Sequence, residues 1–209
     1  MTLKLFYSPG ACSLAPHIVL EEIGTEWEPV RVSLKDGAQR RPEYLAINPK
    51  GRVPALATDQ GVITENPAIL AFLAQTFPQA NIAPVSDPFG MAQVNSFNGF
   101  LSSSLHPAFA HAFRPERFGE GEEAARAMRS RAPVAVAEYL QLAEEKLGGN
   151  EWIHGDYTVS DPYLFVFTGW APRLSVDMTA FPKLQSHRER MMQRPAVKAA
   201  LAREESATG

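Results

Sequence analysis

The sequence holds a single cysteine, Cys12, in a setting that suits reactive chemistry. It comes after a short apolar segment and the turn at Pro9 and Gly10, just before a stretch whose periodicity predicts a helix. Free backbone N–H groups and the dipole at a helix start favour negative charge, so we expect a lowered thiol pKa. Ser13 can donate a hydrogen bond to the sulfur. The alternative is that Cys12 is a small apolar core residue.

Pro54 stands where a strand is expected, over residues 53–57. Proline cannot donate to a strand ladder, which makes it awkward inside a central strand. A cis Val53–Pro54 bond at the strand edge would turn the backbone groups of Val53 outward, ready to pair with an extended peptide. A trans proline in an edge strand is the alternative.

Glu65, Asn66 and Pro67 stand at the start of a predicted helix, with Asn66 as its cap and Pro67 in its first turn. Backbone N–H groups at such a start bind anions, so a substrate carboxylate fits there. Glu65 can pair with a substrate ammonium group, and the two together match the α-amino acid end of a ligand. Alternatively, both residues only serve the helix.

Apolar periodicity and turn residues predict two domains that position these groups. Residues 1–80 read as strand, helix, strand, short helix, hairpin and helix, a small α/β domain of βαβαββα order. Residues 81–88 read as a linker, and residues 89–209 as an all-helical domain. In that domain Thr158 and Asp161 have the spacing of a capping box before a nearly all-apolar helix, which we expect at the domain centre.

Composition excludes several classes of partner and site. The 209 residues carry a net charge of -3 and no basic cluster, which argues against nucleic acid. We expect neither a signal peptide nor a membrane span, and one cysteine fits a reducing compartment, so a cytoplasmic protein is predicted. The histidines lack metal-ligand spacing, and no metal is expected.

The order of elements and several motifs resemble the glutathione transferases. "NPKGRVPAL" and "TENPAIL" are similar to segments of their thioredoxin-like domain, and "HGDYTVSDPYLF" and "RPAVKAAL" extend the likeness over nearly the whole chain. "FYSPGACSLAPHIVL" looks like the bacterial beta class, in which a cysteine occupies the active-site position. The resemblance implies a mixed four-stranded sheet, a C-terminal helical bundle, glutathione as cosubstrate and a homodimer.

The resemblance also assigns roles to individual residues. Cys12 would contact the glutathione sulfur and form a mixed disulfide with it, and Val53, before a cis Pro54, would bind the cysteinyl backbone. His106 would point toward the thiol and move a proton near neutral pH. The implied catalytic residues are Cys12, Ser13 and His106. The implied glutathione-binding residues are Cys12, Lys35, Arg52, Val53, Pro54, Glu65, Asn66, Asn98 and His106.

Three positions depart from the beta-class pattern. Pro107 stands where a lysine commonly follows the histidine, which removes a cation and suggests a helix kink. Gly99 stands where relatives carry an asparagine that reaches the partner subunit's glutathione, and Asn98 lies beside it. Lys35 is the nearest candidate for a basic residue expected after the second strand.

An apolar pocket beside Cys12 would receive a small hydrophobic electrophile. The aromatic candidates for its lining are Tyr7, Phe109, Phe113, Phe118 and Trp170. For the four in the helical domain, a place in the core of the bundle is at least an equally good alternative.

The function predicted is that of a glutathione transferase with a cysteine at the glutathione site. It would conjugate glutathione to electrophiles, carry out glutathione-dependent thiol–disulfide exchange, or do both. The alternatives are a non-catalytic stress-response or regulatory binding protein on the same fold, and a glutathione-dependent dehalogenase or isomerase. The sequence does not select an electrophile.

Overall fold

The computed structural model describes residues 2–207 and contains one mixed four-stranded sheet. Its strands are β1 (Lys4–Tyr7), β2 (Glu28–Arg31), β3 (Ala55–Thr58) and β4 (Gly61–Thr64), in the order β2-β1-β3-β4. β1 pairs in parallel with β2 and antiparallel with β3, and β3 forms a hairpin with β4. The predicted thioredoxin-like sheet is therefore confirmed.

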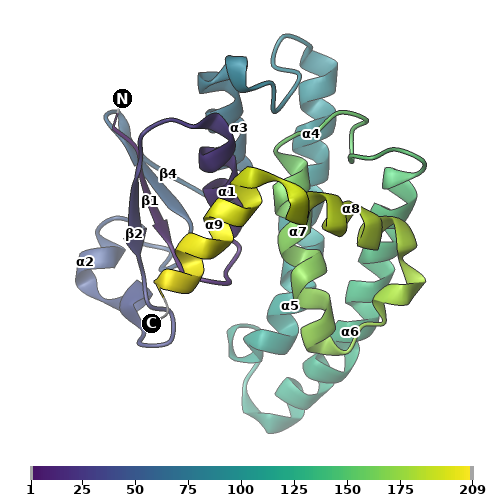
Figure 1. Ribbon diagram of the computed structural model, residues 1–209. Coiled ribbons are helices and arrows are strands. Elements are labelled where there is room, and N and C mark those ends of the chain that lie inside the picture. Colours follow the sequence, from purple (N-terminus) through teal and green to yellow (C-terminus); the bar gives the residue numbers. More distant parts are fainter. Residues whose placement is uncertain (1, 208–209) are drawn as a thin grey trace.

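Helices cover both faces of the sheet. α1 (Leu14–Ile23) and α3 (Asn66–Thr76) lie between the sheet and the helical domain, and α2 (Pro42–Leu45) lies on the other side (Figure 1). Because α1 is buried along most of its length, it belongs to a core shared by both domains. A second, smaller apolar cluster forms on the α2 side, around Tyr44 and Val53.

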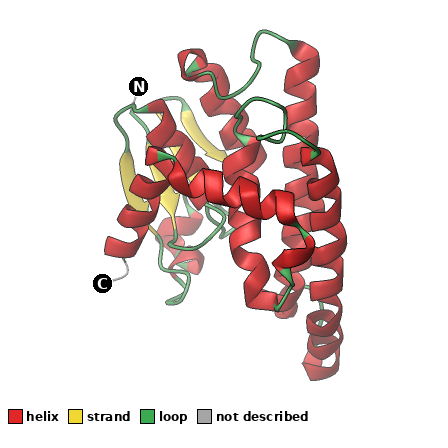
Figure 2. Cartoon of the chain, turned by 45° about the vertical axis from the view of Figure 1, so that its right-hand side comes forward, coloured by secondary structure: helices red, strands yellow, loops and turns green. Residues whose placement is uncertain are grey.

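The rest of the described chain, up to residue 207, is mainly helical, as predicted, and Figure 2 shows the strands confined to one side of the molecule. The helices are α4 (Pro88–Phe100), α5 (His106–Phe113), α6 (Gly121–Leu147), α7 (Ser160–Trp170), α8 (Pro182–Gln193) and α9 (Pro195–Ser206). Residues 160–168 of α7 are all buried, which confirms this helix as the centre of the domain. α9 runs back across α1, so the end of the chain packs on the N-terminal domain (Figure 1). Within residues 2–207, no helix combines the length and apolar character that crossing a membrane requires.

Two helix boundaries differ from the prediction. A helix kink is predicted at Pro107, but α4 continues through a π-helical turn, Leu101–Leu105, directly into α5. Because a π turn is wider and its bonds span five residues, it accommodates a proline, which has no N–H. At α3 the cap is Glu65, with φ of 75°, and not Asn66. Asn66 is the first helical residue, and its side chain donates to the carbonyl of Cys12 and does not cap the helix.

The predicted capping pair before α7 is present, although the helix begins at Ser160 and not at Thr158. The Asp161 carboxylate accepts the N–H of Thr158 at 2.7 Å and also that of Ile153 at 3.0 Å. It further lies 3.0 Å from Nε2 of His187 on α8, and both side chains are fully buried. Asp161 therefore joins three segments of the helical domain, a role that the spacing alone did not reveal.

Candidate functional site

Cys12 lies in the tight turn that joins β1 to α1. The turn is closed by Ser13, whose hydroxyl accepts the N–H of Ser8 at 3.1 Å and donates to its carbonyl at 3.2 Å. Ser13 is fully buried. Its hydroxyl is thus committed to the backbone of Ser8, and the expected hydrogen bond from Ser13 to the Cys12 sulfur is absent from residues 2–207.

The same turn is held from the helical domain through both backbone groups of Gly10. The Gly10 N–H donates to Oε2 of Glu204 on α9 at 2.8 Å, and its carbonyl accepts Nε1 of Trp170 at 3.0 Å. Glu204 is buried, and its other oxygen lies 3.2 Å from Nδ1 of His17 on α1. The position of the cysteine therefore depends on α7 and α9 as well as on the sheet.

The three motifs singled out in the sequence meet at Cys12. Its Sγ donates to the carbonyl oxygen of Val53 at 3.5 Å, and its own carbonyl accepts Nδ2 of Asn66 at 3.0 Å. The Val53–Pro54 peptide bond is cis, and Val53 lies outside the paired strand, which begins at Ala55. A thiol, a peptide segment outside the strand ladder and a helix start are thus side by side.

The thiol pKa is raised and not lowered, so this part of the prediction is wrong. Burial raises the pKa of Cys12 to about 12, and the lowering effects of backbone N–H groups, Asn66 and Arg52 are smaller. Only 7% of the residue is exposed. The free energy lost when a thiolate is removed from water exceeds the stabilisation that the N–H groups at the helix start provide. At neutral pH, Cys12 is a protonated donor.

The raised pKa predicts how the free protein responds to a thiol reagent. Below pH 9, alkylation of Cys12 by iodoacetamide should accelerate about tenfold per pH unit, because only the thiolate reacts. Intact-mass spectrometry over a pH series measures the rate, with a cysteine peptide as the reference. A plateau at pH 7–8 would show that the thiol is already ionised there and would contradict the expected protonated state.

Glu65 presents its carboxylate beside the start of α3, but it already has a partner. Lys50 Nζ lies 2.7 Å from Oε1 of Glu65 and 2.8 Å from the hydroxyl of Thr64. Both charged side chains are about half exposed. An incoming ammonium group would therefore exchange with Lys50, a residue of the "NPKG" turn that the sequence analysis missed.

His106 packs against aromatic rings at the start of α5. Its ring centroid lies 5.5 Å from those of Phe167 and Trp170. Burial, followed by the charges of Arg52 and Arg117, lowers the pKa of His106 to about 4. The imidazole is therefore neutral at pH 7, and within residues 2–207 it has no hydrogen bond to Cys12, so the expected proton transfer near neutral pH is not supported.

The aromatic candidates for a substrate pocket fall into two groups. Tyr7 and Phe109 belong to the core, with 3% and 0% exposure, and their burial contradicts a place on an open pocket wall. Phe113 and Trp170 are partly buried, and Phe118 is 46% exposed with its ring 4.3 Å from that of His111. Only these three can reach a ligand without rearrangement of the core.

Asn98 and Lys35, the remaining predicted glutathione-binding residues, differ in their exposure. Asn98 is 1% exposed on α4. Because its side chain is buried, a partner subunit could not reach it without a rearrangement, so the expected cross-subunit contact is not supported. Lys35 is exposed in the loop after β2.

Tyr163 of α7 also lies near Cys12, and the sequence analysis missed it. Burial and the nearby Cys12 raise the pKa of the Tyr163 hydroxyl, and a hydrogen bond from Asn66 lowers it in part. Asn66 thus stands between the cysteine turn and the central helix. The segment "DPYLF", which contains Tyr163, predicted only a helix. Sequence could not place Tyr163 near Cys12, because that requires the packing of the two domains.

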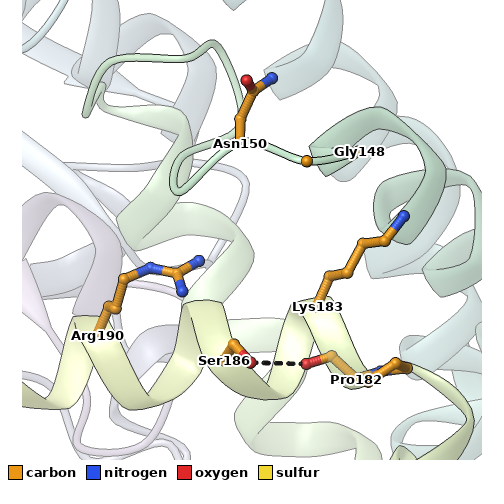
Figure 3. Close-up of a pocket in the computed structure, with 7 residues that line it drawn as sticks. Gly148, Asn150, Pro182, Lys183, Ser186 and Arg190 are labelled. Carbon is orange, nitrogen blue, oxygen red and sulfur yellow. Dashed lines mark hydrogen bonds between the residues drawn. The ribbon is translucent and has the colours of Figure 1, made fainter.

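One surface hollow is remote from Cys12. A cavity of about 280 Å³ lies where the end of α6 meets the start of α8, and Figure 3 shows Lys183 and Arg190 on one side with Asn150 opposite. None of the predicted site residues lines it. It plays no part in the chemistry around Cys12.

Comparison with known proteins shows that both halves of the chain are similar to glutathione S-transferases. The family profile described as "Glutathione S-transferase, N-terminal domain" matches residues 1–75, and "Glutathione S-transferase, C-terminal domain" matches residues 101–195. Glutathione S-transferase GstA of Escherichia coli O157:H7 is 36% identical over 97% of this chain and 98% of its own.

Solved structures of glutathione transferases are also similar to this chain. A glutathione transferase homolog from sulfitobacter, with bound glutathione, is 35% identical with a TM-score of 0.92, over 97% of this chain and 98% of its own. The bacterial beta class glutathione S-transferase of Sphingomonas chungbukensis is 40% identical with a TM-score of 0.85, over 96% and 98%.

Proposed function

Because the chain belongs to the glutathione S-transferase family, we propose that it conjugates glutathione to electrophiles at the site around Cys12. The main support for this proposal is the hydrogen bond from Cys12 Sγ to the carbonyl oxygen of Val53, at 3.5 Å. A peptide that pairs with the backbone of Val53 through its cysteinyl residue brings its own sulfur next to Cys12. Glutathione is such a peptide.

The protonated state of Cys12 supports a role as hydrogen-bond donor. When the cysteinyl N–H of glutathione takes the Val53 carbonyl, the S–H of Cys12 is released and can donate to the glutathione sulfur. A donor aimed at a developing anion stabilises it, so the bound glutathione loses its proton more readily. The pKa of about 12 keeps the proton on Cys12 while the glutathione thiolate attacks the electrophile.

The remaining contacts of glutathione are proposed from the positions of charged groups. Glu65 would hold the γ-glutamyl ammonium in place of Lys50, and the backbone N–H groups at the start of α3 would bind its carboxylate. Arg52, next to Val53, and the exposed Lys35 would face the glycyl carboxylate. We also propose a homodimer, on the strength of the family resemblance, and size-exclusion chromatography with light scattering tests it.

Thiol–disulfide exchange at the same sulfur is a second candidate, favoured by the contact between Cys12 and the peptide segment. Cys12, once deprotonated, would attack the glutathione sulfur of a mixed disulfide, and the departing thiolate would take up a proton. A glutathione thiolate would then attack the Cys12–glutathione disulfide, which releases oxidised glutathione and restores Cys12. The raised pKa makes the first step slow unless ligand binding changes the surroundings of the thiol.

Titration calorimetry tests glutathione binding directly. Wild-type protein should bind glutathione at pH 7, and Glu65→Gln should weaken binding by about tenfold, because a charge-assisted bond to the ammonium is lost. Glu138→Gln, which removes an exposed carboxylate paired with Arg131 on α6, is the control and should bind as wild type does. No binding by the wild-type protein would overturn the proposed function.

A further inference from the structure

A second cavity adjoins the Cys12 site and is lined by arginines. It measures about 570 Å³ and lies between residues 34–52 of the N-terminal domain and the turn that follows α5. Its lining comprises Leu34, Gln39, Arg40, Arg52, Arg114, Glu116 and Arg117. We call the cavity formed around the four guanidinium groups the arginine pocket.

The positive charge of the arginine pocket is offset only in part by the protein. Within residues 2–207, none of the four guanidinium groups forms a hydrogen bond or an ion pair, whereas Arg131, Arg194 and Arg203 each pair with a glutamate. Burial and the nearby Arg52, Arg114 and Arg40 lower the pKa of Arg117. Glu116 is the one carboxylate on the wall. A cluster of like charges in a chain of net charge -3 indicates a site for an anion.

Two observations connect the arginine pocket to the reacting sulfur. Arg52 directly precedes Val53, and its charge acts on both Cys12 and His106. Arg117 acts on His106 from the helical side.

We propose that the arginine pocket binds an anionic group, a carboxylate or sulfonate, carried by the electrophilic cosubstrate. The inference rests on the proposed function and narrows it, because a wall with four arginines does not fit the small hydrophobic electrophile expected from the sequence. Arg114 and Arg117 are the specificity-determining residues, since they belong to the helical domain, whereas Arg52 adjoins the peptide segment proposed for glutathione. Guanidinium groups suit this role because their fixed pairs of N–H donors can form two parallel hydrogen bonds to two oxygens of such an anion.

The test compares chlorodinitrobenzoate with chlorodinitrobenzene, two electrophiles that share a leaving group and differ in a carboxylate. The ratio of their kcat/KM values should fall at least about tenfold in the double variant Arg114→Gln/Arg117→Gln, because two charged contacts to the carboxylate are lost. Arg126→Gln/Arg129→Gln removes the same charge from an exposed face of α6 and should keep the wild-type ratio. An unchanged ratio in the first variant overturns the proposal.

A binding measurement separates this inference from the proposed function. Unreactive dinitrobenzoate should bind the wild-type protein more tightly than dinitrobenzene, and the preference should disappear in Arg114→Gln/Arg117→Gln. This holds even if the protein conjugates neither electrophile, a result that would count against the proposed function alone. If the double variant instead loses glutathione affinity in the same proportion, the arginines serve glutathione and the inference is wrong.

Discussion

Replacement of Asp161 by alanine should lower the free energy of unfolding by about 3–5 kcal/mol. The carboxylate is fully buried and accepts hydrogen bonds from the N–H groups of Ile153 and Thr158, with His187 as a third partner. Its removal leaves these groups buried without an acceptor, and each unpaired donor carries its own desolvation cost. The segment before α7 and its attachment to α8 would loosen together.

Denaturant unfolding followed by circular dichroism measures this effect. Asp161→Asn keeps one carbonyl oxygen and the side-chain volume, so it should lose less stability than Asp161→Ala. Asp156→Ala, on the exposed part of the preceding loop, should change the free energy of unfolding by no more than about 0.5 kcal/mol. If Asp161→Ala unfolds at the wild-type denaturant concentration, the network carries no net stabilisation.

Replacement of Cys12 by alanine should lower kcat/KM for conjugation by about 10- to 100-fold, the loss expected for one hydrogen bond to a charged group. Cys12→Ser retains a donor of similar geometry and should stay within a few fold of wild type. The measurement is the rate of conjugation at saturating electrophile as the glutathione concentration is varied, which gives kcat/KM for glutathione. Calorimetry measures glutathione affinity separately. Full activity in Cys12→Ala would contradict the donor role.

Cys12→Ala and Cys12→Ser also test whether Cys12 acts covalently in thiol–disulfide exchange. Wild-type protein incubated with oxidised glutathione should gain one glutathione-sized adduct in intact-mass spectrometry, and both variants should gain none, because neither carries a thiol. A variant that keeps full exchange activity would exclude covalent catalysis by Cys12. Serine separates the two chemistries, since it can donate a hydrogen bond but cannot form a disulfide.

The fold was predictable because its signals are local. The apolar periodicity of α1, the turn before β4 and the single proline that begins each of α8 and α9 all lie within a short window of sequence. The meeting of Cys12, Val53 and Asn66 was predictable only through the resemblance to a family. No local rule brings residues more than forty positions apart into contact.

The electrostatics of the site were not predictable, because they depend on both domains. The helix start argued for a lowered pKa at Cys12, but the packing of α7 and α3 around the thiol buries it, and burial dominates. The arginine pocket was missed for the same reason. Arg40 and Arg52 come from one domain, Arg114 and Arg117 from the other, and their charges add only once the domains have packed.

The two hydrogen bonds to Gly10 also set a time at which the site becomes complete. A chain is synthesised from its N-terminus, and domains generally fold as units in that order. The turn that carries Cys12 is therefore made first, while Trp170 and Glu204 follow about 160 and 190 residues later. Until α7 and α9 dock, Gly10 lacks both partners, so the growing chain carries its cysteine in a turn that is not yet held in place.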